Sequence, residues 1–288
     1  MQGLEGFMQG IDVYQILWFF MVYAFLGWCT EVVYAAVTTG EFVNRGFLNG
    51  PLCPIYGFGV IGVVYALRPV ADQFFLLFIG SVLLTSALEW LTGFVLEKLF
   101  QNKWWDYSDK PFNLNGYICL AFSILWGLAC VFVIRIVHPT VVTFVEFMPQ
   151  LVGWFILMAG LILFVSDLTV TVFAVIGLNK RLEQLDVIAN RLKYLSDELG
   201  ENISDYTLTM MEKNEQLRDK VGEYKQDAEL KMETYRQEAE ALLNSRKELL
   251  LKSKAIQRRL VKAFPRLSSK RFELELGRIK REILAKRK

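Results

Sequence analysis

Residues 151–178 form an apolar stretch of 28 residues in which Asp167 is the single charged side chain. The hydrocarbon core of a bilayer is about 30 Å thick, and a helix needs about 20 mainly apolar residues to cross it. A helix that is apolar on every side must be covered by lipid or by a large protein core. The stretch therefore predicts a membrane-spanning helix.

Four further apolar stretches precede it. Those of spanning length cover about Val13–Val37, Phe74–Leu99 and Ile118–Val137. The other, Ile55–Leu67, is long enough only if the approach Phe47–Pro54 is counted, so a short span and a re-entrant segment both remain open, and we favour the short span. The predicted fold class is all-α: a polytopic helical membrane bundle of about five spans, followed by a long cytoplasmic coiled-coil tail.

Charge divides the chain near Leu178. Apolar residues make up 53% of the sequence, above the usual share for a soluble domain. The first 178 residues carry 6 basic and 11 acidic side chains, whereas residues 179–288 carry 26 and 19. We therefore predict three parts: a transmembrane helical domain over residues 1–178, cytoplasmic coiled-coil helices over 179–264, and a basic C-terminal helix over 265–288.

The basic residues of the short loops predict the orientation, because such loops are retained in the cytoplasm. With five spans and the basic tail inside, four loop residues lie inside (Arg45, Lys98, Lys103 and Lys110) and two lie outside (Arg68 and Arg135). The N-terminus is then outside. Residues 44–57 and 104–116 are predicted to emerge together on the cytoplasmic face.

The stretch NRGFLNGPLCPIYG, residues 44–57, has an irregular composition. Its three glycines permit positive φ or close backbone approach, and its two prolines fix φ and withhold an N–H donor. Irregular backbone at membrane depth must be buried in protein or line a water-filled cavity. An ordinary interfacial turn remains open, but Asn44, Arg45 and Asn49 supply more polar groups than a turn requires. We therefore predict a polar vestibule on the inner face.

Three acidic residues lie inside predicted spans: Glu31, Glu89 and Asp167. A charge at mid-bilayer costs about 2.5 to 3.5 kcal/mol on insertion scales, so each acid is expected to face a partner, a cavity or a proton. Each could alternatively be a polar tether between helices. The nearest basic partner for Glu31 is Arg45.

Asp106 lies in the second loop beside Trp104, Trp105 and Tyr107, which form either a substrate-recognition corner or a belt of interfacial anchors. The candidates for substrate binding or for a polar path are therefore polar residues of the spans and of both loops. They are Glu31, Asn44, Arg45, Asn49, Tyr56, Glu89, Asp106, Tyr107, Asn115 and Asp167.

No soluble-type catalytic set is recognisable in the sequence. The single His, His138, precedes Pro139 and fits an interfacial residue better than a ligand or a base. A Gly-rich phosphate loop ending in Lys and Ser or Thr is absent, so energy would have to come from a separate ATPase subunit or from an ion gradient. We predict no enzymatic activity, no metal site and no cofactor, and we expect the four Cys to be packing residues.

Four segments resemble one known family: FVNRGFLNGPLCPIYGFG, LEWLTGFVLEKLF, WWDYSDKPFNLNGYICL and SILWG. In this order they are similar to the ABC-transporter type IV permeases of bacteria, also called the CmpB family, over about residues 13–178. The resemblance implies a permease-like protein of the bacterial plasma membrane and assigns no catalytic residue. Relatives often carry Arg where this chain has Tyr117, so any anion binding by that Arg would fall here to Arg45 or Lys110.

The tail has the spacing of a heptad seam, with Leu178, Leu182, Leu185, Leu192, Leu195 and Leu199. Such a helix would fold back as a hairpin or pair with another chain, and homo-oligomerisation through the coiled coil is the leading prediction. Residues 246–288 carry 16 basic and 4 acidic side chains. They are predicted to be a solvated basic helix or to bind anionic lipid, and nucleic acid is the less favoured partner.

Two functions of different classes follow. The first is a transport component, permease-like and ABC-transporter-like, in which the buried acids and the loop residues form a polar path. The second is a membrane-anchored scaffold or sensor that oligomerises through its coiled coil. A third and less favoured function is an intramembrane enzyme that uses Asp106 or Glu89 as acid or base.

Overall fold

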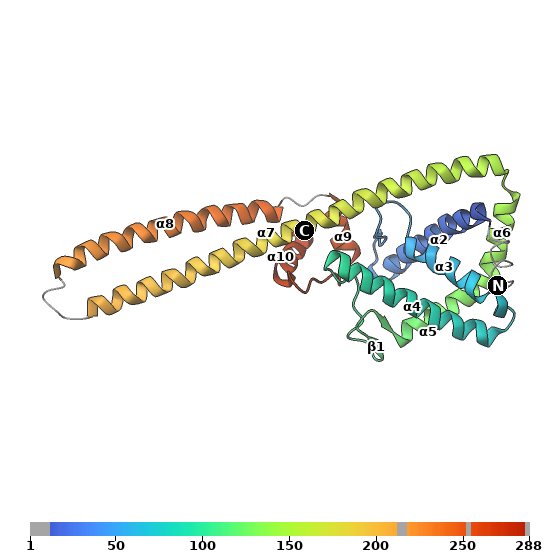
Figure 1. Cartoon of the computed structure of the whole chain (residues 1–288), viewed down its shortest axis with the longest axis horizontal. Helices are drawn as coiled ribbons and strands as arrows, with labels where there is room; N and C mark the ends of the chain where they lie inside the picture. The colour runs from blue at the N-terminus through green and yellow to red at the C-terminus, as the bar shows by residue number, and fades with distance from the viewer. Residues whose placement is uncertain (1–11, 212–217, 252–254, 286–288) are drawn as a thin grey trace, which may run out of the picture. The chain divides into compact units, whose positions relative to one another are not determined.

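The computed structural model describes residues 12–211, 218–251 and 255–285, and nearly all of them are helical (Figure 1). The all-α fold class is confirmed. In chain order the first helices are α2 (Val13–Thr39), α3 (Pro54–Leu67), η1 (Arg68–Val70), α4 (Phe74–Phe100), α5 (Leu120–Phe132), the π-helix η2 (Val133–Val137), α6 (His138–Phe147) and α7 (Gln150–Met211). The last are α8 (Arg218–Leu251), α9 (Ala255–Ala263) and α10 (Glu273–Ala285). An antiparallel pair, β1 (Asn113–Leu114) and β2 (Ile118–Cys119), precedes α5.

Four helical stretches of the described residues are long and apolar enough to cross a membrane: Val13–Thr39, Phe74–Phe100, Leu120–Phe147 and Gln150–Asp205. They overlap the first, third, fourth and fifth predicted spans. Helix α3 has 14 residues, which makes it about 21 Å long and shorter than the hydrocarbon core of a bilayer. The count of five spans therefore stays a prediction.

The chain forms two compact units. Unit 1 comprises residues 1–176 and 255–271, and unit 2 comprises residues 177–254 and 272–288. Helix α9 and residues 264–271 thus group with the apolar helices. The sequence analysis did not predict this return.

Helix α2 contributes to a buried apolar core of unit 1. Its residues form a buried cluster with α6 and α7 that consists of Tyr14, Trp18, Phe19, Tyr23, Val141, Val145 and Leu157. The hydroxyl of Tyr23 lies 2.8 Å from Nδ1 of His138, so the single His is bonded to α2.

Helix α3 packs antiparallel against α2. The backbone N–H of Cys53 donates to the carbonyl of Ala24 at 2.9 Å, and one turn later Gly57 lies against Phe20. A Cβ added at Gly27 would lie 2.2 Å from Cγ of Tyr56. Only glycine permits this close approach of the two helices.

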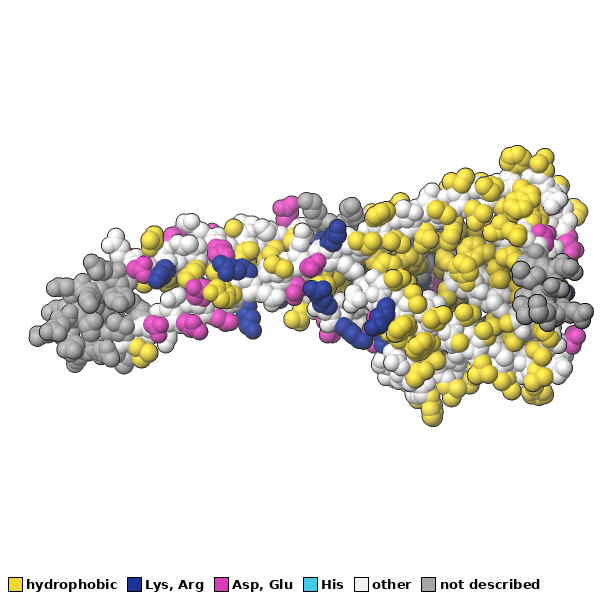
Figure 2. Space-filling view, in the orientation of Figure 1, with side chains coloured by type: hydrophobic (Ala, Val, Ile, Leu, Met, Phe, Trp, Pro, Cys, Tyr) yellow, Lys and Arg dark blue, Asp and Glu magenta, His cyan; other side chains and the backbone are white. Residues whose placement is uncertain are grey.

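The outer surface of the unit 1 helices is apolar, as Figure 2 shows on one face. On α7, Phe155 and Leu163 are each 70% exposed, and Phe75 at the start of α4 is 76% exposed. A continuous exposed apolar surface of this kind is rare on soluble monomers and typical of membrane contact. The surface therefore fits a multi-pass membrane protein.

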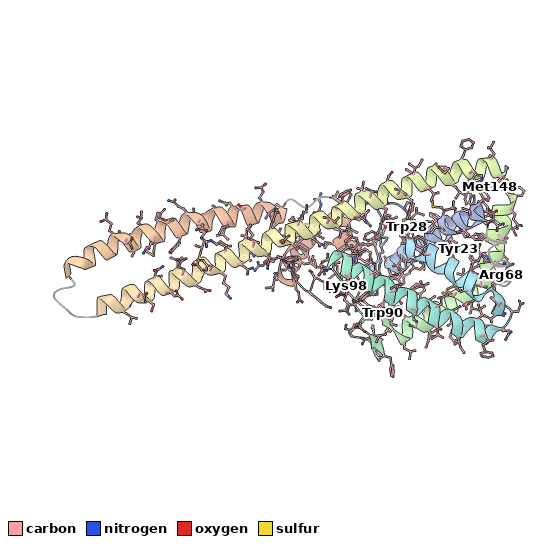
Figure 3. All side chains as sticks on the ribbon, viewed as in Figure 1. Tyr23, Trp28, Arg68, Trp90, Lys98 and Met148 are labelled. Atoms are coloured by element: carbon pink, nitrogen blue, oxygen red, sulfur yellow. The ribbon has the colours of Figure 1, made fainter. Side chains whose placement is uncertain are left out.

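The helix bundle of unit 1 has two different ends. The segments 40–53 and 101–119 lie at one end together with α9, and we call this the α9 end (Figure 1). Arg68 and Met148, labelled in Figure 3, lie at the opposite end. There Nη2 of Arg135 donates to the carbonyl of Asp72 at 2.9 Å.

In unit 2, α8 runs beside the later part of α7 (Figure 1). Nε of Arg191 on α7 lies 2.7 Å from Oε1 of Glu238 on α8. The seam residues Leu182 and Leu185 are fully buried. The tail thus takes the hairpin arrangement, one of the two that were predicted, while the coiled coil and the oligomer stay predictions.

Candidate functional site

Asp167 is the acceptor that holds the irregular loop 44–50 to α7. Its Oδ1 accepts the backbone N–H of Asn49 at 3.1 Å and the side-chain amide of Asn49 at 2.8 Å. Its Oδ2 accepts the backbone N–H of Gly50 at 2.7 Å. These donors compensate for placing a carboxylate in an otherwise apolar helix.

Arg259 of α9 binds the same loop. Its Nη1 donates to the carbonyl of Gly46 and its Nη2 to the carbonyl of Phe47, both at 2.7 Å, while Nε donates to Oδ1 of Asn49 at 3.0 Å. Burial lowers the pKa of Arg259, and the nearby carboxylate of Asp167 offsets this lowering only in part. The planar guanidinium thus matches carbonyls that would otherwise lack donors.

A second charged pair lies where the loop meets α2. Nε of Arg45 is 3.3 Å from Oε2 of Glu31, which confirms the predicted contact. The hydroxyl of Tyr56 donates to Oε1 of Glu31 at 2.7 Å. Asn44 completes the loop: its Oδ1 accepts Nε1–H of Trp28 at 2.9 Å (Trp28 is labelled in Figure 3).

In the second loop, Asp106 organises the turn before β1. Nζ of Lys103 donates to Oδ1 of Asp106 at 2.9 Å and to the backbone carbonyl of Asn115 at 2.8 Å. The hydroxyl of Ser108 donates to the same Oδ1 at 2.6 Å. Partial burial raises the pKa of Asp106, but the hydrogen bonds from Ser108 and Lys103 outweigh it and hold the pKa below its usual range.

Glu89 of α4 makes one weak contact with this loop. The hydroxyl of Tyr107 lies 3.4 Å from Oε1 of Glu89, at the long limit of a hydrogen bond. Within the described part of the chain, Oε2 of Glu89 is buried and accepts no hydrogen bond. Burial raises the pKa of Tyr107, and the carboxylates of Glu89 and Glu31 raise it further. Both carboxylates therefore raise the pKa of the same phenol, that of Tyr107.

Residues 255–271, which we call the strap, join the two loops. The backbones of Lys103 and Ser268 pair in both directions, with N···O distances of 2.8 and 2.9 Å. Nη1 of Arg266 donates to the carbonyl of Asp106 at 2.7 Å and to Oδ1 of Asp109 at 3.1 Å. The hydrogen bond and charge of Arg266 hold the pKa of Asp109 below its usual range.

Aromatic rings fill the junction between the loops and the strap. The ring centroid of Trp104 lies 5.1 Å from that of Phe47 and 5.0 Å from that of Phe264. The two unusual loops thus meet at one end of unit 1, which is the arrangement that the sequence predicted for them.

The structure sorts the ten candidate residues into two groups. Around the first loop lie Glu31, Asn44, Arg45, Asn49, Tyr56 and Asp167. Around the second lie Glu89, Asp106, Tyr107 and Asn115, the last contributing its backbone carbonyl.

Sequence reasoning missed the strap residues Arg259, Arg266 and Lys270. A signal was present, because buried apolar residues interrupt the basic run there: Leu260, Val261 and Leu267 are at most 2% exposed. A fully solvated basic helix does not require an apolar face.

The sequence model of one protein family, described as "Putative ABC-transporter type IV", matches residues 18–172, just over half of the chain. The matched region holds both loops, most of α2, the helices α3 to α6, the first part of α7 and all ten candidate residues, whereas the strap lies outside it. No curated protein and no solved structure matched. Because this match covers more than half of the chain, the chain belongs to the family described as "Putative ABC-transporter type IV".

Proposed function

We propose that this protein is a permease-like component of a transport system and has no ATPase site of its own. The observation that carries the proposal is Glu89, an acid within an apolar helix whose Oε2 is buried without a donor among the described residues. Asp167 and Glu31, by contrast, are bonded to strong donors. An intramembrane acid with unused acceptor capacity is typical of proton or ion pathways.

Two sets of polar contacts support a route from Glu89 toward the α9 end. Tyr107 links Glu89 to the second loop, and Tyr56 links Glu31 to α3. Arg45 then connects Glu31 to the irregular loop. We infer that these residues form the polar path and that the strap closes it at the α9 end.

The proposed orientation places the α9 end in the cytoplasm. Arg45, Lys98, Lys103 and Lys110 lie in or beside the loops of that end, and the strap adds six basic residues. Arg68 and Arg135 belong to the opposite end. With the positive-inside tendency, the proposed position of the N-terminus is outside. The membrane we propose, from the family resemblance, is the bacterial plasma membrane.

A separate ATPase subunit is the proposed partner, because the sequence lacks a phosphate-binding loop and the family is of the ABC-transporter type. Purification of the full chain at endogenous expression, followed by mass spectrometry, tests this. We expect a protein with a P-loop motif to be enriched over a purification from cells that express an unrelated membrane protein. Equal recovery in both would contradict the partnership.

Proton movement tests the path itself. The full chain is reconstituted into liposomes loaded with a pH-sensitive dye, and a potassium diffusion potential is imposed. We expect proton flux in the wild type, loss of that flux in Glu89→Gln, and retention in Glu146→Gln, because Glu146 is an exposed acid on α6. Equal flux in the two variants would count against Glu89 as part of a path.

The scaffold or sensor remains the second candidate, and the helical hairpin of unit 2 favours it. Its helices leave apolar side chains exposed, with Ile203 54%, Leu208 61% and Leu230 69% accessible. A second copy of the chain could cover them. Mass photometry in detergent would show dimers or larger species if so, and a monomer at all concentrations would contradict oligomerisation.

A further inference from the structure

A polar cleft of about 170 Å³ lies at the C-terminal end of α4 in unit 1. Its lining residues are Glu97, Lys98, Gln101, Lys103 and Lys270. Gln101 ends the helix in a left-handed conformation with φ 55°. Three of the five lining side chains are therefore basic, and they come from α4, from the second loop and from the strap.

The acid in the cleft is already satisfied. Oε1 of Glu97 lies 2.7 Å from Nζ of Lys270, and Oε2 accepts the hydroxyl of Tyr117 at 2.7 Å. The Lys270 side chain is nevertheless 85% exposed, so it keeps donors available to an incoming group. With Lys103 paired to Asp106, the cleft still carries a positive excess.

The contacts of Lys98 indicate how deep in the bilayer the cleft lies. Its Nζ lies 5.7 Å from the ring centroid of Phe94, and that ring stacks on Trp90 at 5.4 Å. Trp90 and Lys98 are labelled in Figure 3 along α4. A lysine that runs over aromatic rings at the end of an apolar helix places its ammonium at the level of lipid headgroups.

An apolar row on α4 leads to the cleft. Leu91, Val95 and Leu99 recur at intervals of four residues and so share one face of the helix. They are 51%, 40% and 70% exposed. The row lies on a helix long and apolar enough to span a membrane, so its exposed side chains fit contact with lipid tails.

We propose that this cleft binds the phosphate group of an anionic phospholipid, whose acyl chains lie along the row formed by Leu91, Val95 and Leu99. Lys98 and Lys270 supply the charge and the N–H donors, because lysine binds phosphate as a compact point charge. The assignment does not depend on transport. It identifies a lipid phosphate as the ligand of the basic residues at the α9 end.

The test uses the full chain in a neutral detergent, with native mass spectrometry counting bound lipids during titration. Phosphatidylglycerol is compared with phosphatidylcholine and with inorganic phosphate alone. One lysine near an anionic surface contributes about 1 kcal/mol, so Lys98→Gln should weaken phosphatidylglycerol binding about fivefold. Lys98→Arg should restore it. Lys262→Gln, an exposed lysine of α9 outside the cleft, should leave it unchanged.

Two results would overturn the assignment. Equal retention of phosphatidylglycerol by Lys98→Gln and Lys262→Gln would place the lipid elsewhere. Competition by inorganic phosphate at millimolar concentration, with no gain from acyl chains, would show a free phosphate site rather than a lipid site. Lys98→Gln removes the contact of Nζ with the ring of Phe94, so the melting temperature of the variant is measured to check that it folds.

Discussion

Nε of Arg259 donates to the side-chain oxygen of Asn49 at 3.0 Å across 210 positions of the sequence. The amide of the same Asn49 donates to Asp167 at 2.8 Å. Asn49 thus connects Arg259 of α9 with Asp167 of α7, and the irregular loop is bonded to both helices. The contact of α9 with this loop depends on the arrangement.

Arg259→Gln should destabilise unit 1. The exchange leaves the carbonyls of Gly46 and Phe47 without their donors, and each buried hydrogen bond to a charged group contributes about 1.5 to 3 kcal/mol. We expect a lower melting temperature in detergent. Arg258→Gln, at the exposed neighbouring position, is the matched control. Equal melting temperatures of the two variants would contradict the role of Arg259.

Gly27→Ala should separate α2 from α3. The added methyl group would overlap the Tyr56 side chain, and such overpacking typically costs about 1 to 3 kcal/mol. Gly59→Ala is the control on α3, where an added Cβ has nothing within 4 Å. That variant should be neutral or more stable by about 0.5 to 1 kcal/mol, because alanine favours helix. Similar thermal unfolding of both variants would refute the close packing at Gly27.

A double-mutant cycle with Glu31→Gln and Arg45→Gln should reveal coupling. The two side chains are 25% and 30% exposed, so solvent screens part of their attraction. We expect an interaction energy of about 0.5 to 1.5 kcal/mol in unfolding experiments. Strict additivity of the two single effects would show that the pair contributes nothing to stability.

Low pH should weaken the contact of the strap with Asp106 and Asp109. The pKa values of Asp106 and Asp109 are lowered in the folded protein, by hydrogen bonds that include those from Lys103, Ser108 and Arg266. Their stabilising contribution is therefore complete above the ordinary Asp pKa of about 4 and is lost as the pH falls through the lower folded-state values.

Hydrogen exchange at the amide of Ser268, corrected for its intrinsic rate, measures this weakening. Protection should be constant from about pH 5 to 8 and should fall below about pH 4. In Asp109→Asn the fall should be smaller. A pH-independent protection in the wild type would contradict a contribution from these ion pairs, which bond Arg266 to Asp109 beside the backbone pairing of Ser268.

The positions of the apolar helices were predictable from the sequence. Hydrophobic length decides whether a helix can cross lipid, and the predicted starts at Val13 and Phe74 coincide with the starts of α2 and α4. The contact of Arg45 with Glu31 was also predictable, because a buried acid close to one basic residue requires a partner.

The strap was not predictable in the same way. Its contacts with Asn49 and Lys103 join positions far apart in the chain, and periodicity reports only neighbours on one helix. The basic residues of the strap outweighed its apolar residues in the sequence pattern. Buried Leu260 and Leu267 show that the apolar residues decide where it packs.

The central claim is that the two loops lie on one side of the membrane, where both contact the strap. Phe42 is 70% exposed and Lys110 is exposed, so Phe42→Cys and Lys110→Cys, each in a protein whose four native Cys are replaced by Ala, are suited to labelling. A membrane-impermeant maleimide is added to sealed vesicles of known orientation. We expect both positions to react from the same side, the cytoplasmic one; labelling from opposite sides would contradict the account.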